Sequence, residues 1–105
     1  MPAEHGSSTK LHSLSLASGV WLIESQINWG SNSVGRREHT LRQGGAWNST
    51  MLAGNSHDAD PTSPTYQNCV GIISTPDITE VSVWGIQTSG NPLNFGGTVK
   101  ATRLK

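Results

Sequence analysis

The chain has 105 residues, enough for one domain, of which 33% are hydrophobic and 13% are charged. Seven basic and seven acidic residues give a formal net charge of zero, which argues against nucleic-acid binding and against attachment to an anionic membrane. No apolar run approaches the roughly 20 residues of a membrane-spanning helix. The first residues lack the basic and apolar regions of a signal peptide, so we expect synthesis in a cytoplasm and no membrane insertion.

So few hydrophobic residues predict a thin core for a domain of this size. A disulfide, a structural metal or burial between subunits can compensate for a thin core. The single cysteine, Cys69, excludes an internal disulfide, and no cluster of metal ligands stands out. The composition therefore predicts an oligomer.

In chain order, residues 1–10 are small and polar and predict a flexible N-terminal arm, whereas residues 11–105 predict one folded domain. Period-two alternation is strongest in residues 20–29, where Trp21, Ile23 and Trp29 share one face. Residues 36–42 have Leu41 as their only apolar side chain and predict an edge strand or an outward-facing one. Residues 54–64 predict the least structured segment. Further strands are expected at residues 14–16, 46–53, 66–74, 78–88 and 93–105.

Seven or eight short strands at a spacing of about 10–12 residues predict an all-β fold, an antiparallel jelly-roll-like β-sandwich. No stretch sustains a helical period, and no internal repeat is present. Ser89-Gly90-Asn91-Pro92 predicts a tight turn before the last strand.

Few residues suggest catalysis or metal binding. His57, Asp58 and Asp60 share the segment 54–64, but their spacing does not match a calcium loop, and zinc requires three or four ligands. No serine lies in a nucleophile-elbow pattern, and Cys69 lies among apolar neighbours, where a buried, inert thiol is expected. We therefore predict no enzymatic activity, no cofactor and no metal.

Four arginines allow two interpretations. They could form a basic face for phosphate or an acidic sugar, or they could pair across strands with Glu24, Glu38 and Glu80, which is the favoured interpretation. These arginines are Arg36, Arg37, Arg42 and Arg103.

The strand at residues 78–88 is apolar on both faces, with Trp84 and Ile86 opposite Val81 and Val83. A small sandwich cannot cover both faces of one strand, so a second protein surface is expected to cover one of them. We predict that these four residues lie at an oligomer interface. An alternative function, recognition of a saccharide, would use loop residues, for which the candidates are Asn32, Arg36, Trp47, Asn55 and Asp58.

Two segments, GVWLIESQINWGSNSVGRREHTLRQGG (residues 19–45) and VSVWGIQTSGNPLNFGGTVKATRLK (residues 81–105), carry a family resemblance. They resemble the jelly-roll domains of the tumour-necrosis-factor and complement-globular-head superfamily, in the form met in bacteriophage and bacterial surface proteins. The resemblance implies a homotrimer with a non-enzymatic role in adhesion or assembly.

We therefore expect a bacteriophage virion protein that contacts other capsid or tail proteins, either as a trimeric capsid decoration protein or as a short fibre head. The alternative is a receptor-binding or carbohydrate-binding tip that recognises polysaccharide on the host surface.

Overall fold

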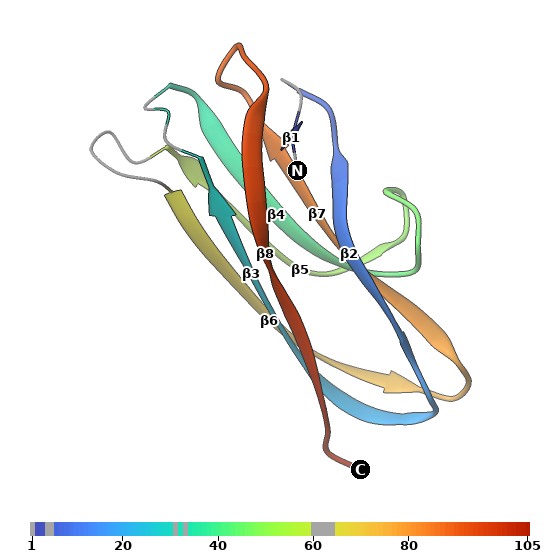
Figure 1. Cartoon of the computed structure of the whole chain (residues 1–105). Helices are drawn as coiled ribbons and strands as arrows, with labels where there is room; N and C mark the ends of the chain where they lie inside the picture. The colour runs from blue at the N-terminus through green and yellow to red at the C-terminus, as the bar shows by residue number, and fades with distance from the viewer. Residues whose placement is uncertain (1, 4–5, 31, 33, 60–64) are drawn as a thin grey trace.

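The computed structural model describes residues 2–3, 6–30, 32, 34–59 and 65–105, and Figure 1 shows two β-sheets packed face to face. Within these residues eight strands follow one another: β1 (Pro2–Ala3), β2 (Thr9–Leu16), β3 (Gly19–Trp29), β4 (Arg36–Gln43), β5 (Thr50–Asp58), β6 (Thr65–Thr75), β7 (Thr79–Gln87) and β8 (Leu93–Arg103). The described residues include no helix that is long and apolar enough to cross a membrane.

The strand order is that of an eight-stranded jelly roll. One sheet has the order β1-β8-β3-β6 and the other β2-β7-β4-β5, and all pairs are antiparallel. Only β4 and β5 are neighbours both in sequence and in a sheet, so the other described connections cross between the sheets. The molecule measures 42 × 22 × 18 Å, with β1 near one end and the C-terminus at the other (Figure 1). The predicted all-β, jelly-roll-like sandwich is confirmed.

Strand β3 shows why the alternation in the sequence was informative. Ile23, Ile27 and Trp29 point into the sandwich and are buried, whereas Glu24 and Asn28 are exposed. Because side chains alternate along a strand, one apolar face is enough to align β3 between β6 and β8.

The core lies between the sheets and contains an aromatic stack. The rings of Trp29 and Phe95 lie 4.8 Å apart at an interplanar angle of 13°. Gly85 of β7 lies against this stack, since a Cβ built there would come within 2.9 Å of the Trp29 ring. The other members of this core cluster come from both sheets: Ala3, Leu16, Ile23, Ile27, Leu41, Cys69, Ile73, Val81, Val83 and Leu93.

The interior also holds large polar side chains, which explains the low hydrophobic content. Arg37 and His39 of β4, Gln67 of β6 and Gln87 of β7 are each no more than 1% exposed. Gln67 accepts a hydrogen bond from the Trp29 indole at 2.7 Å and donates to the Arg37 carbonyl at 3.0 Å. Burial of polar groups is tolerated when their hydrogen bonds are replaced within the protein.

The segment expected to be a flexible arm, residues 1–10, contributes to both sheets. Pro2–Ala3 pairs with the start of β8, Ala3 is fully buried, and β2 already begins at Thr9. Backbone pairing and burial of Ala3 attach this segment to the sandwich.

The predictions for β4 and β5 were wrong in part. β4 lies between β7 and β5, not at an edge, because its inward polar side chains are accommodated in the interior. Trp47 lies in the turn that joins β4 to β5, and β5 extends to Asp58, through the first part of the segment expected to be unstructured. Asp60 and residues 61–64 lie outside the described residues.

Candidate functional site

The outer face of the β1-β8-β3-β6 sheet carries a row of exposed apolar side chains. Tyr66, Val70 and Ile72 lie on the outward side of β6 and are 57%, 58% and 66% exposed. Leu22 of β3 lies directly opposite Ile72 and extends the row toward the middle of the sheet. We call these four residues the β6 apolar row. Three large apolar side chains exposed on one strand favour contact with another macromolecule.

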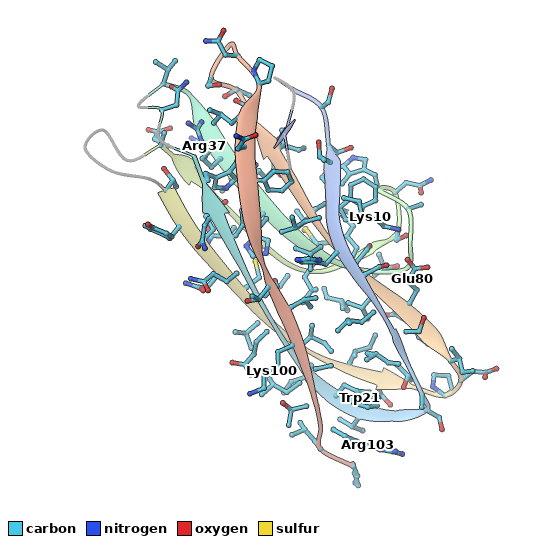
Figure 2. The ribbon with its side chains drawn as sticks, viewed as in Figure 1. Lys10, Trp21, Arg37, Glu80, Lys100 and Arg103 are labelled. Atoms are coloured by element: carbon cyan, nitrogen blue, oxygen red, sulfur yellow. The ribbon has the colours of Figure 1, made fainter. Side chains whose placement is uncertain are left out.

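A shallow polar groove of about 400 Å³ lies beside the β6 apolar row. Glu24 of β3 faces Lys100 of β8 across the strand pair, and Figure 2 labels Lys100 on this face. Glu24 and Lys100 form no ion pair with each other in the described part of the chain. The groove is lined by these two residues with Ser25, Gln26, Asn68, Cys69, Val70 and Thr98.

The outer face of the other sheet carries two tryptophans and three charged side chains. Trp84 of β7 and Trp47 of the β4–β5 turn meet edge to face, with ring centroids 5.7 Å apart and an interplanar angle of 62°. The Arg42 guanidinium lies 4.2 Å from the centre of the Trp47 ring, and Lys10 Nζ lies 5.8 Å from the Trp84 ring. Lys10 also pairs with Glu80 at 3.1 Å (Figure 2). We call these five residues the tryptophan surface.

Hydrogen bonds hold the Trp84 ring and the turn that carries Trp47 in place. The Trp84 indole donates to the Ser82 hydroxyl at 2.8 Å, and that hydroxyl donates to the Gly44 carbonyl at the start of the turn. Arg42 donates to the Ser49 carbonyl at 2.9 Å, and Ser49 also bonds to Ala46 within the turn. The turn that carries Trp47 is therefore tied to β4 and β7.

A serine and a histidine meet inside the core. Ser25 Oγ and His39 Nε2 are 2.8 Å apart, and His39 Nδ1 has no partner in the described part of the chain. Burial lowers the pKa of His39 from 6.5 to about 4, so the imidazole is neutral at neutral pH. Ser25 is 4% and His39 0% exposed. This pair is closed to a substrate and has no described carboxylate to orient the histidine, so it does not form a catalytic triad.

Arg37 is fully buried near one end of β4 (Figure 2). Its guanidinium donates to three backbone carbonyls, those of Asn32 at 2.8 Å, Val34 at 3.0 Å and Arg36 at 3.0 Å. Burial lowers the pKa of Arg37 from its ordinary value, although an arginine remains protonated in proteins. The side chain fastens the loop before β4 onto the sandwich.

The four residues predicted at an oligomer interface divide between two environments. Val81 and Val83 are fully buried in the core, which corrects their assignment, because they point inward and cannot contact another subunit. Trp84 and Ile86 point outward and are half-buried. Trp84 belongs to the tryptophan surface, and Ile86 lies opposite Glu38 of β4.

The five residues suggested for saccharide binding do not form one site. Arg36 donates to Asp58 at 3.2 Å and to Ser56 at 3.0 Å, at the same end of β4 as the Asn32 loop. Trp47 follows the other end of β4, about 20 Å away at the usual rise per residue. Asn55 donates to the Asn68 carbonyl at 3.3 Å and links β5 to β6.

The four arginine side chains lie in different environments. Arg37 is internal, Arg36 pairs with Asp58, and Arg42 belongs to the tryptophan surface. Arg103 lies over Trp21 at 5.7 Å, at the end of the molecule that holds the C-terminus (Figure 2). They do not make a single basic face.

Sequence reasoning missed the β6 apolar row and the contact between Arg42 and Trp47. A signal for the row was present, because strand 66–74 has Val70 and Ile72 on one face and Cys69 and Ile73 on the other. The same double-sided pattern drew attention to residues 78–88. Arg42 gave no such signal, since its contact with Trp47 depends on the shape of the turn.

No family model matches the sequence, and no curated protein is detectably similar to it. The proposed function therefore rests on the strand order, on the surfaces described above and on the resemblance carried by residues 19–45 and 81–105.

Proposed function

We propose that this protein is a non-enzymatic structural protein that forms a homotrimer through the outer face of its β1-β8-β3-β6 sheet. The observation that carries the proposal is the β6 apolar row, where Tyr66, Val70 and Ile72 are each more than half exposed. Burial of apolar surface is the main favourable contribution to most protein association.

The size of the β6 apolar row is suited to a subunit contact. Burying the exposed part of each of its three large side chains stabilises an assembly by about 1–2 kcal/mol. The groove beside it supplies Glu24 and Lys100, charges of opposite sign. Around a threefold axis the contact between neighbours is heterologous, so Glu24 of one copy can pair with Lys100 of the next, which favours identical subunits as partners.

We further propose a bacteriophage virion as the setting, with the trimer serving as a capsid decoration protein or a short fibre head. This assignment rests on the resemblance carried by residues 19–45 and 81–105, and a jelly-roll sandwich is consistent with it. A second function, recognition of a host saccharide through loop residues, is less favoured because the five suggested residues lie apart.

The experiment that tests self-association is light scattering coupled to size-exclusion chromatography over a dilution series. Wild-type protein is expected to have the mass of a trimer. Ile72→Asp places a charge in the proposed contact and should give a monomer, because an unpaired buried charge costs several kcal/mol.

Ile78 offers a matched control, since this isoleucine is 77% exposed in the turn between β6 and β7. Ile78→Asp should leave the trimer intact. A monomeric wild type would overturn the proposal. So would a trimer disrupted by Ile86→Asp but not by Ile72→Asp, because the contact would then lie on the opposite sheet.

The virion setting is tested separately with purified capsids. A decoration protein should bind them and raise their resistance to heat. A protein that binds host cells and competes with phage, but ignores capsids, would instead favour the recognition function.

A further inference from the structure

The tryptophan surface lies on the sheet opposite the proposed trimer contact, so it needs a separate explanation. The rings of Trp47 and Trp84 are inclined at 62° to each other, and both are half-buried on this outer face. A sequence with four tryptophans in 105 residues places two of them here, half-buried and not in the core. Such pairs supply a large, rigid contact area with little loss of conformational freedom on binding.

The geometry of this surface is fixed before any ligand arrives. Trp84 is held through Ser82 to the Gly44 carbonyl, and the turn that carries Trp47 is held by Arg42 and Ser49. Gly45 lies so close to the Glu80 carboxylate that a Cβ there would come within 2.7 Å of it. Preorganised sites bind more tightly because less freedom is lost on binding.

The polar groups of this surface favour a negatively charged ligand. Lys10 and Arg42 supply two positive charges against the single carboxylate of Glu80. The Nε of Arg42 is buried and out of reach of a ligand, so the guanidinium would bind one through its terminal nitrogens, one of which already donates to the Ser49 carbonyl.

We propose that the tryptophan surface binds a saccharide that carries a carboxylate, such as a uronic acid. The flat C–H face of a sugar ring packs on the solvent-exposed part of the Trp47 and Trp84 indoles. The carboxylate lies beside the guanidinium of Arg42 and the ammonium of Lys10. Arginine suits this task because its planar donors match the two oxygens of a carboxylate. A protein with no net charge lacks the broad positive field that would favour nucleic acid.

The direct test is isothermal titration of the wild-type protein with three acidic probes: tetragalacturonate, tetramannuronate and a sialyl trisaccharide. The matched neutral probe is fully methyl-esterified tetragalacturonate, which keeps the rings and removes the charge. At least one acidic probe should bind, and if it is tetragalacturonate, the ester should bind about tenfold more weakly, as expected for loss of a charge-assisted contact.

Variants locate the site. Trp47→Ala and Arg42→Met should each weaken binding about tenfold, as expected for removal of an aromatic or guanidinium contact. Arg103→Met is the matched control, because Arg103 also lies over a tryptophan and donates to a backbone carbonyl, that of Ser18. It should bind like the wild type. Circular dichroism melts of each variant establish that the protein is folded before it is titrated.

Four results would overturn the proposal. The first three are no binding of any acidic probe by folded wild-type protein, equal binding of tetragalacturonate and its ester, and equal losses in Arg42→Met and Arg103→Met. The fourth is equal binding of polyglutamate, since it would show that charge alone is recognised. The oligomeric state is measured in a separate experiment, so a failure of the saccharide proposal would leave the proposal of a trimer unaffected.

Discussion

Acidification is expected to destabilise this protein through His39. The side chain is fully buried and its Nε2 is bonded to Ser25 Oγ, so protonation would place a positive charge in the core. Burial lowers the pKa of His39 to about 4 in the folded chain, against 6.5 for an exposed histidine. The unfolded chain therefore binds more protons between these two values, and stability is lost as the pH falls from 6.5 toward 4.

The expected loss follows from the two pKa values of His39. Between pH 7 and pH 5 the free energy of unfolding should fall by about 2 kcal/mol, and by about 3 kcal/mol at pH 4. Urea unfolding followed by tryptophan fluorescence at pH 7, 6 and 5 measures this loss. The protein concentration is held constant, because self-association would make stability concentration-dependent.

His39→Gln separates this contribution from other titrating groups. The amide can keep a hydrogen bond to Ser25 but cannot take up a proton in this range, so the loss between pH 7 and pH 5 should shrink by about 2 kcal/mol. His12→Gln controls for removal of a histidine, since His12 is exposed and bonds to the Gly97 carbonyl. If His39→Gln and the wild type lose the same stability over this range, burial of His39 is not the cause.

Three further predictions concern the core. Gly85→Ala should destabilise the fold by about 1–3 kcal/mol in thermal melts, because its Cβ would meet the Trp29 and Phe95 rings at 2.9 and 3.0 Å, whereas Gly96→Ala, with open space around it, should change little. Gln67→Leu should cost about 1–3 kcal/mol in urea unfolding by leaving the Trp29 indole unpaired, and equal loss in the exposed neighbour Asn68→Leu would contradict this reasoning. Burial raises the pKa of Cys69 to about 11, so a thiol reagent at pH 8 should react with it at least about 100-fold more slowly in the folded chain than in denaturant; a fast reaction under native conditions would refute this.

The sequence predicted the strands whose alternation was strong. In β3, Ile23, Ile27 and Trp29 define one face, and a shift of a single residue would expose all three. The turn after β7 was predictable because Gly90 has φ near 91°, a conformation that favours glycine.

The position of β4 was not predictable because its burial depends on polar contacts that form only in the folded chain. Arg37 and His39 are polar, and only the carbonyls of the preceding loop and the hydroxyl of Ser25 make their inward positions acceptable. Ser25 lies on another strand, and the carbonyls, although close in sequence, meet the guanidinium only through the shape of the folded loop, so the alternation of residues in β4 does not reveal these contacts. Pairing with β5 and β7 then places the strand inside its sheet.

The candidate surfaces were predictable only in part, for a related reason. An apolar side chain on a strand can point to the core or to solvent, and β6 and β7 have apolar residues on both sides. The sequence alone therefore indicated that another protein surface covers one face of β7, but it did not show which residues lie on that face. Packing decides this, since Val81 and Val83 meet the other sheet while Trp84 meets Trp47.

The two outer faces of the sandwich carry different side chains, and we propose self-association for one face and saccharide binding for the other. The β6 apolar row belongs to one sheet and the tryptophan surface to the other, and the core lies between them. A partner that covers Tyr66, Val70 and Ile72 leaves Trp47 and Trp84 facing away from it. Association of copies through the first face would therefore multiply the second, and several weak saccharide contacts on one assembly would bind a polymeric surface more tightly than a single copy does.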